Sequence, residues 1–172
     1  MLEGRRIAVV IPARDEAPFV AGVIRGLPAY VDDVVVVDDA SRDGTSSVVA
    51  ALGDRRVRIH RHERARGAGA AVAAGYRLAF EAGADVAVVM AGDGQMDPAD
   101  LPAVLAPVLR DEADYVKGDR LSFPHARRHM PLLRWMGNHL FSALTRLATG
   151  LALRDSQCGY TALARRAAAR VD

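Results

Sequence analysis

The sequence predicts a three-layer α/β fold in which a mostly parallel central sheet lies between helices. Three observations predict it: short apolar runs of strand length, longer stretches of helical periodicity between them, and turn-forming residues where each run stops. The run Val86–Met90 is typical, because it is apolar at every position, as a strand buried on both faces of a parallel sheet requires. A chain of 172 residues with this alternation indicates one domain.

The elements follow one another in regular order. Strands are predicted at Ile7–Ile11, Val34–Val37, Val57–His60, Val86–Met90 and Tyr115–Lys117. Helices between them are predicted from apolar residues at helical spacing: Val20, Val23, Ile24 and Leu27; Val48, Val49 and Leu52; Val72, Tyr76, Ala79 and Phe80; Leu101, Val104, Leu105 and Val108. Pro98 is well placed to open the last of these helices, because a first turn does not need its missing N–H.

Composition excludes several classes of protein. A net charge of +2, from 23 basic and 21 acidic residues, gives no reason to expect nucleic-acid binding. Cys158 is the only cysteine, so no intrachain disulfide can form and a reducing, cytoplasmic compartment is expected. Met1–Arg6 has no signal-peptide pattern, and no apolar run reaches the roughly 18 residues of a membrane span.

The segment Arg120–Arg154 contains arginines and histidines but no acidic residue. Within it, an apolar stripe at helical spacing consists of Leu133, Met136, Leu140, Leu144 and Leu147. One interpretation is an amphipathic helix packed on the sheet. A second, compatible interpretation is that this cationic segment faces an anionic headgroup or a membrane surface.

Acidic residues follow three predicted strands, in Pro12–Glu16, at Asp38 and Asp39, and at Asp93. Parallel strands bring their carboxyl ends to one sheet edge, where open α/β sheets bind ligands. Helix capping is the alternative explanation for these residues. With Gln95, Asp93 offers oxygen ligands to Mg²⁺ or Mn²⁺, which predicts a metal that bridges the phosphates of a nucleotide.

Two common nucleotide-binding motifs are missing. The first predicted strand is followed by Pro12–Glu16 rather than Gly-x-Gly-x-x-Gly, and no Gly-x-x-x-x-Gly-Lys occurs. Gly67 and Gly69 follow the third strand, and a tight turn into a helix explains them equally well.

Five motifs occur in an order that resembles family-2 glycosyltransferases of the GT-A fold, a Rossmann-like three-layer domain. They are Ile11–Ala17, Val37–Thr45, Gly67–Ala71, Gly92–Pro98 and Gly118–Arg120. The likeness is greatest to the dolichol-phosphate mannose synthase-like branch, which moves a sugar from a nucleotide to a polyprenyl phosphate. Asp155–Tyr160 resembles the later Asp-x-x-x-Gly-aromatic motif of that branch.

The resemblance implies a nucleotide-sugar site. Pro12, Arg14, Glu16 and Gly67 would line it, with Val37 and Asp39 against ribose and base and Asp38 in support. Asp93 would bind metal and diphosphate at the catalytic centre, with Gln95 as a further metal ligand. Arg120 would meet the phosphates of a GDP- or UDP-linked sugar.

It also implies an acceptor side. Residues 1–118 would form the nucleotide-sugar half of a single catalytic domain and residues 119–172 the acceptor half. Arg127, Arg128 and Arg134 would hold the acceptor phosphate, and Asp155 would orient the acceptor or act as a base, a helix or turn cap being the alternative. The implied reaction inverts the anomeric carbon by single displacement, at the inner face of a membrane.

Two departures from the family pattern matter. First, Ala91 stands where the family has the first acidic residue of Asp-x-Asp, and this change would weaken metal binding. Second, relatives usually continue beyond Asp172 with acceptor-binding sequence, so a shortened chain is possible. Two other functions therefore stay open: a transferase with a soluble acceptor, and a non-catalytic nucleotide-sugar-binding domain. A sugar-1-phosphate nucleotidyltransferase is disfavoured, because its glycine-rich loop after the first strand is missing.

Overall fold

The computed structural model describes residues 1–122, 131–151 and 153–168. The chain forms two compact units. The sheet unit comprises Met1–Val116 with Tyr160–Asp172, and the α6 unit comprises Lys117–Gly159.

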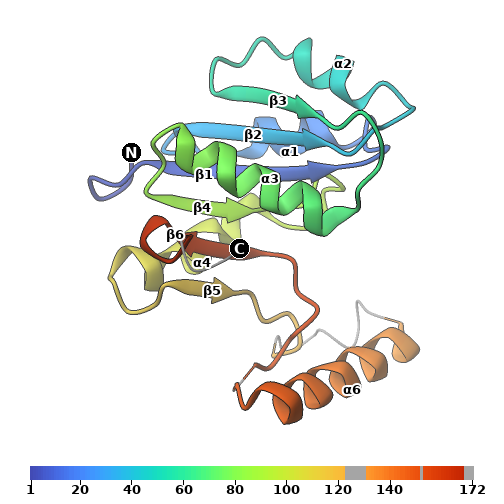
Figure 1. Ribbon diagram of the computed structural model, residues 1–172, viewed down its shortest axis with the longest axis vertical. Coiled ribbons are helices and arrows are strands. Elements are labelled where there is room, and N and C mark those ends of the chain that lie inside the picture. Colours follow the sequence, from blue (N-terminus) through green and yellow to red (C-terminus); the bar gives the residue numbers. More distant parts are fainter. Residues whose placement is uncertain (123–130, 152, 169–172) are drawn as a thin grey trace. The chain divides into compact units, whose positions relative to one another are not determined.

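A six-stranded sheet with the order β3-β2-β1-β4-β6-β5 organises the fold (Figure 1). Its strands are β1 (Ile7–Ala13), β2 (Asp33–Asp38), β3 (Val57–Arg61), β4 (Val86–Val89), β5 (Tyr115–Lys117) and β6 (Thr161–Ala164). β1 pairs in parallel with β2 and β4, and β2 pairs in parallel with β3, whereas β6 runs antiparallel to β4. The sheet is therefore mostly parallel, as predicted.

Helices alternate with the strands along the chain. They are α1 (Val20–Gly26), α2 (Thr45–Ala50), α3 (Ala68–Glu81), the 3₁₀ turn η1 (Pro98–Asp100), α4 (Leu101–Leu109), α6 (Leu132–Thr149) and α7 (Arg165–Ala168). α3 approaches β1 closely at Gly75, where an ideal Cβ would lie 2.1 Å from Cγ1 of Val10. Only glycine fits at that point, so the sequence of α3 sets how deeply this helix packs.

The core consists of strand side chains buried on both sheet faces, together with buried side chains of α1, α3 and α4. All residues of β2 and β4 are buried, and β1 is buried at every position except the half-buried Pro12. β3 is one of the two edge strands, and its residues are half-buried or exposed. This difference explains why the central strands read as continuous apolar runs and β3 does not.

All five predicted strands and the helices between them are confirmed, and no strand bound shifts by more than two residues. The prediction omitted β6, because Thr-Ala-Leu-Ala is short and contains two weak strand formers. This strand places the segment after Gly159 beside β4 in the sheet unit.

The helix predicted from the apolar stripe is also confirmed as α6. Its stripe residues are at least half exposed, with Leu133 at 84% and Leu147 at 86%. Among the side chains of α6 that the structure describes, Ser142 is the buried one, and its Oγ accepts a hydrogen bond from the Ser156 N–H at 3.0 Å. Within the described ranges, no helix is both long and apolar enough to cross a bilayer.

Candidate functional site

The carboxyl ends of β3, β2, β1 and β4 lie along one edge of the sheet, because these four neighbours are parallel. The loops that leave this edge carry Arg14, Glu16, Asp39, His62 and Asp93. The predicted convergence of acidic strand ends is therefore confirmed in the backbone. Such an edge is where open α/β sheets bind ligands.

Hydrogen bonds fasten the loop after β1 to the loop after β2. They run from Asp15 N to Ser41 Oγ (3.0 Å), from Glu16 N to Thr45 Oγ1 (2.9 Å), from Ala17 N to Asp43 Oδ2 (2.9 Å) and from Arg42 N to Asp15 Oδ1 (2.7 Å). Asp15 and Ala40 adopt left-handed backbone conformations, with φ of 56° and 59°. The many short contacts keep these strained residues in place, so the two loops form a preorganised wall.

Asp38 supports this wall from inside. Its carboxylate is fully buried, accepts a hydrogen bond from the Ser41 N–H at 2.7 Å and one from the Ser46 hydroxyl, and pairs with Arg61 Nη1 at 3.1 Å. Burial alone would raise the pKa of Asp38, but these hydrogen bonds lower it below the ordinary value. Asp38 thus holds the loop after β2 in place, and its predicted support of a nucleotide site stays a prediction.

Asp39 is turned toward the loop after β3. Oδ1 lies 2.7 Å from His62 Nδ1 and accepts from the Arg66 N–H at 2.8 Å, while Oδ2 accepts from the Gly67 N–H at 2.8 Å. Burial opposes ionisation, but these donors outweigh it and lower the pKa of Asp39 to about 2. Groups of the protein itself therefore already use most of the hydrogen-bonding capacity of the Asp39 carboxylate. The predicted contact of Asp39 with ribose and base stays a prediction.

The loop after β4 presents Asp93 beside a sharp turn. Asp93 is half-buried, and its Oδ1 accepts a hydrogen bond from the Gln95 N–H at 2.9 Å across Gly94, whose φ is 74°. Gly92 packs against the end of β1, since an ideal Cβ there would lie 3.4 Å from Ile11 and 3.6 Å from the Cβ of Glu16. The Asp93 loop and Glu16 are therefore neighbours.

Glu16 has an unusual carboxylate. Its Oε2 is enclosed and has no hydrogen-bond partner among the described residues. Burial is the main cause that raises the pKa of Glu16, followed by the negative charges of Asp93 and Asp43. A cation at this place would relieve both the orphaned oxygen and the repulsion.

The donor set suits a divalent cation that is shared with phosphates. Carboxylate oxygens of Asp93 and Glu16 and the amide oxygen of Gln95 are the hard ligands that Mg²⁺ and Mn²⁺ prefer. Across the described part of the chain, no three His, Cys, Asp or Glu side chains form a complete metal cage. The residues fit an ion that is held by one or two carboxylates and completed by substrate phosphates.

The other predicted nucleotide-site residues differ in how far their side chains are exposed to solvent. Arg14 is exposed, Pro12 is half-buried, and Val37 is fully buried in the core cluster, so its side chain faces the core rather than the loops. Gly67 is the N-cap of α3 with φ 89°, which confirms the tight turn into a helix, and its N–H is occupied by Asp39.

In the α6 unit, Arg120 and Asp155 form a bidentate ion pair. Arg120 Nε donates to Asp155 Oδ2 at 2.9 Å and Nη2 to Oδ1 at 3.3 Å, and the Gln157 N–H donates to Oδ1 at 3.0 Å. Burial would raise the pKa of Asp155, but Arg120 and the backbone donors lower it. A carboxylate held in this way is a weak base, which favours an orienting role over proton transfer.

A small cavity lies beside this pair. It has a volume of about 210 Å³ and is lined by Lys117, Gly118, Asp119, Leu153, Arg154 and Asp155. The amine of Lys117 donates to the Cys158 carbonyl. Of the predicted acceptor-phosphate residues, Arg134 lies in α6, while Arg127 and Arg128 lie outside the described residues.

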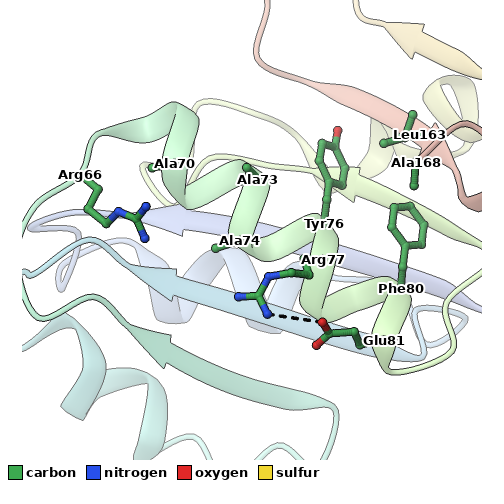
Figure 2. Close-up of a pocket in the computed structure, with 10 residues that line it drawn as sticks. All are labelled: Arg66, Ala70, Ala73, Ala74, Tyr76, Arg77, Phe80, Glu81, Leu163 and Ala168. Carbon is green, nitrogen blue, oxygen red and sulfur yellow. Dashed lines mark hydrogen bonds and ion pairs between the residues drawn. The ribbon is translucent and has the colours of Figure 1, made fainter. Parts of the chain in front are cut away.

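A larger cavity of about 760 Å³ lies along α3, from Arg66 in the loop before this helix to Leu163 of β6 and Ala168 of α7 (Figure 2). Alanines and the rings of Tyr76 and Phe80 form much of its wall, and Arg77 pairs with Glu81 at 3.4 Å on its rim. Tyr76 Oη and Thr161 Oγ1 are 3.0 Å apart, and burial raises the pKa of Tyr76 to about 12. It contains none of the predicted site residues.

The sequence-based prediction missed His62. A histidine two residues beyond a predicted strand, at the edge that collects Asp39 and Asp93, was the available signal. Its contact with Asp39 spans 23 residues, so only the strand order brings the two together.

Comparisons with known proteins identify the family of this chain. The model of the family described as Glycosyl transferase family 2 matches residues 8–171. The UDP-N-acetylglucosamine–dolichyl-phosphate N-acetylglucosaminyltransferase of Methanococcus voltae is 32% identical over 94% of this chain and 70% of its own length. The undecaprenyl-phosphate mannosyltransferase of Micrococcus luteus is 34% identical over 91% of this chain and 65% of its own.

Solved structures confirm the predicted GT-A fold. Glucosyl-3-phosphoglycerate synthase from Mycobacterium tuberculosis in complex with UDP aligns with a TM-score of 0.68 at 25% identity. The same enzyme with Mn²⁺, UDP and glucosyl-3-phosphoglycerate aligns at 0.66 and 26% identity. Each alignment covers 95% of this chain and 58% of the solved one, so the chain spans little more than half of that enzyme.

Proposed function

Since this chain belongs to glycosyl transferase family 2, we propose that it transfers a sugar from a nucleoside-diphosphate sugar to a polyprenyl phosphate, with inversion and with a divalent cation. The observation that carries the proposal is the sheet edge where the Asp93 loop meets Glu16 beside the fastened loops after β1 and β2. Mn²⁺ and UDP in the solved relative support a donor of this kind.

In this proposal the donor's diphosphate lies at Asp93 and Gln95. A divalent cation held there with Glu16 would neutralise the charge that grows on the leaving diphosphate. The half-buried place of Asp93 keeps its carboxylate partly shielded from water, where such charge interactions are strongest. No enzyme nucleophile is needed, because the acceptor phosphate itself attacks the anomeric carbon in a single displacement.

In this proposal Arg120 keeps the role that the family resemblance implies, contact with the phosphates of the donor, and Asp155 holds it in place. The pair holds the guanidinium in a fixed orientation, and its remaining N–H groups suit phosphate oxygens. Because a phosphate acceptor is already ionised near neutral pH, Asp155 has no proton to remove. We therefore assign it the positioning of Arg120 rather than base catalysis.

The exposed apolar side chains of α6 support an acceptor in a membrane. The helix has no acidic residue in its first turn and carries Arg146 in its last, a composition that suits an anionic bilayer surface. The acceptors in the names of the two curated relatives, dolichyl and undecaprenyl phosphate, are lipids. In this proposal the protein binds peripherally to the inner membrane face from the cytoplasm.

The proposal is tested with UDP- and GDP-linked sugars, Mn²⁺ and undecaprenyl phosphate in phosphatidylglycerol vesicles. Transfer to the lipid is expected, together with sedimentation of the protein on these vesicles but not on phosphatidylcholine. The double variant Leu133→Ser/Leu147→Ser should lose sedimentation, whereas Ala148→Ser, also exposed on α6, should keep it. Donor hydrolysis without lipid transfer would contradict the lipid acceptor.

A soluble phosphorylated acceptor is the second candidate. Its support is the solved relative, whose complex contains glucosyl-3-phosphoglycerate. Turnover with a small phosphorylated acid in the absence of vesicles, at a rate above that with undecaprenyl phosphate, would favour it. The remaining candidate is a non-catalytic nucleotide-sugar-binding domain, which Ala91 motivates. Such a domain would bind nucleotides in a metal-dependent way but would not turn over any acceptor.

A further inference from the structure

α6 is a long helix whose apolar side chains are largely exposed. Its apolar stripe is at least half exposed at every position, and Phe141 beside the stripe is 55% exposed. A helix in a folded protein owes most of its stability to the packing of its apolar face, and one of 18 residues is marginal in water without that packing. A surface that covers the stripe therefore stabilises α6.

Ser142 fastens α6 to the loop that follows it. Its side chain is 1% exposed, and its Oγ accepts a hydrogen bond from the Ser156 N–H at 3.0 Å and lies 3.3 Å from Ser156 Oγ. The serine hydroxyl thus satisfies a backbone donor of the loop. The conformation at Ser156 therefore depends on the helix that holds Ser142 beside it.

The loop that Ser142 fastens also holds the Arg120–Asp155 pair. Asp155 precedes Ser156, and its Oδ1 accepts from the Gln157 N–H at 3.0 Å, so the backbone around Ser156 sets the orientation of this carboxylate. The carboxylate in turn binds the guanidinium of Arg120 and accepts from the Arg120 N–H at 3.2 Å. A chain of contacts within the α6 unit therefore runs from α6 to the guanidinium.

We propose that Ser142 is a positioning residue for Arg120, through which a lipid surface bound by α6 strengthens the binding of the donor's diphosphate. The surface stabilises the helix, the helix holds Ser142 against Ser156, and the fixed loop presents the guanidinium to the phosphates. A site that is correctly arranged for only a fraction of the time binds more weakly by that fraction, and whatever arranges it restores the affinity. The inference rests on the proposed function, in which Arg120 contacts the donor phosphates and α6 binds an anionic membrane.

The first test is calorimetric titration of the wild-type chain with UDP and GDP in Mn²⁺, without vesicles and with vesicles of phosphatidylglycerol or phosphatidylcholine. The nucleotide that binds should do so about three- to tenfold more tightly on phosphatidylglycerol, the range that one hydrogen bond predicts. Phosphatidylcholine, which has no net charge, should leave the affinity unchanged. This arm uses the wild-type chain, so it does not depend on how any variant folds.

A variant assigns the effect to the Ser142 hydroxyl. Ser142→Ala should still sediment on phosphatidylglycerol vesicles, because the apolar stripe is intact. Its nucleotide affinity should be the same with and without vesicles, and no higher than that of the wild-type chain without them. A purely structural role of Ser142 would lower the stability of the fold but would leave the gain on vesicles unchanged.

Thr145→Ala is the matched control. It also removes a hydroxyl from α6, but this hydroxyl donates to the Phe141 carbonyl within the same helix. Thr145→Ala should therefore keep the gain of the wild-type chain. Because Mn²⁺ itself binds phosphatidylglycerol, all chains are compared at the same concentrations of vesicles and Mn²⁺.

Thermodynamic linkage supplies an independent readout. If vesicles tighten the binding of a nucleotide, that nucleotide must tighten the binding of the protein to vesicles by the same factor. Sedimentation at graded lipid concentrations, with and without the nucleotide, should show this gain in the wild-type chain and in Thr145→Ala, and no gain in Ser142→Ala.

An unchanged nucleotide affinity on vesicles that do bind the wild-type chain would overturn the inference, and so would a full gain in a folded Ser142→Ala. If the nucleotide still bound in a metal-dependent way and sugar were still transferred to the lipid, the proposed function would survive either result. Failure of the wild-type chain to bind any nucleotide, or to bind phosphatidylglycerol vesicles, would overturn the inference together with the proposed function.

Discussion

Arg120 holds both carboxylate oxygens of Asp155, and the two residues differ in burial: the Asp155 side chain is fully buried, whereas that of Arg120 is 45% exposed. The guanidinium thus covers an otherwise enclosed negative charge and keeps part of its own surface free. This arrangement explains how one residue can be fixed in place and still be available to a phosphate.

Loss of Arg120 should leave the Asp155 charge buried and uncompensated. Arg120→Ala should therefore destabilise the fold by about 2 kcal/mol, while the double variant Arg120→Ala/Asp155→Ala should be less destabilised than the single one. Urea unfolding at pH 7 measures both. A double variant less stable than Arg120→Ala would show that the unpaired charge of Asp155 is not what destabilises the single variant.

An acidic residue in place of Ala91 is predicted to strengthen metal binding. Ala91→Asp restores a second carboxylate beside Asp93 and should tighten Mn²⁺ binding in the presence of UDP by about tenfold. Ala91→Asn, of similar size and without charge, is the control and should change little. Electron paramagnetic resonance of free Mn²⁺ gives both affinities, and equal values for the two variants would place the ion away from residue 91.

The lowered pKa of Asp39 predicts that the free energy of unfolding depends on pH. Its pKa is lowered from 3.8 to about 2 in the folded chain, so its contribution is complete above pH 4 and is lost as the pH falls toward 2. Asp39→Asn should lower the free energy of unfolding by about 1–3 kcal/mol at pH 7. The difference from wild type should narrow between pH 4 and pH 2.5 in urea titrations, and a constant difference would contradict this assignment.

Gly75 tests the packing of α3 on β1. Gly75→Ala brings a methyl group into Val10 and should cost about 1–3 kcal/mol. Gly69→Ala, in the same helix with open space around it, should gain up to about 1 kcal/mol. Thermal unfolding of the pair separates packing from helix propensity, and a neutral Gly75→Ala would show that α3 sits farther from β1.

The elements of the sheet unit could be predicted because their signal is local. Val86–Val89 is apolar throughout, and Asp93 follows it at once, so both the strand and the carboxylate at its exit are visible in the sequence. β6 was not visible, since Thr161–Ala164 has neither the length nor the β-branched content of the other strands.

The contacts within the site could not be predicted, because they join residues far apart in sequence. Asp39 and His62 are 23 residues apart and Arg120 and Asp155 are 35 apart. The sequence shows that each residue follows a strand or starts a motif, but not that one neutralises or orients the other. Side-chain partners depend on strand order and loop conformation, which local patterns do not contain.

The central claim is that Asp93 anchors a metal-dependent nucleotide site. Calorimetric titration of the wild-type chain and Asp93→Ala with UDP and GDP, each with and without Mn²⁺, tests it most directly. Wild type should bind at least one nucleotide far more tightly with Mn²⁺, and a folded Asp93→Ala should lose that dependence. Undiminished Mn²⁺-stimulated binding in Asp93→Ala would contradict the account.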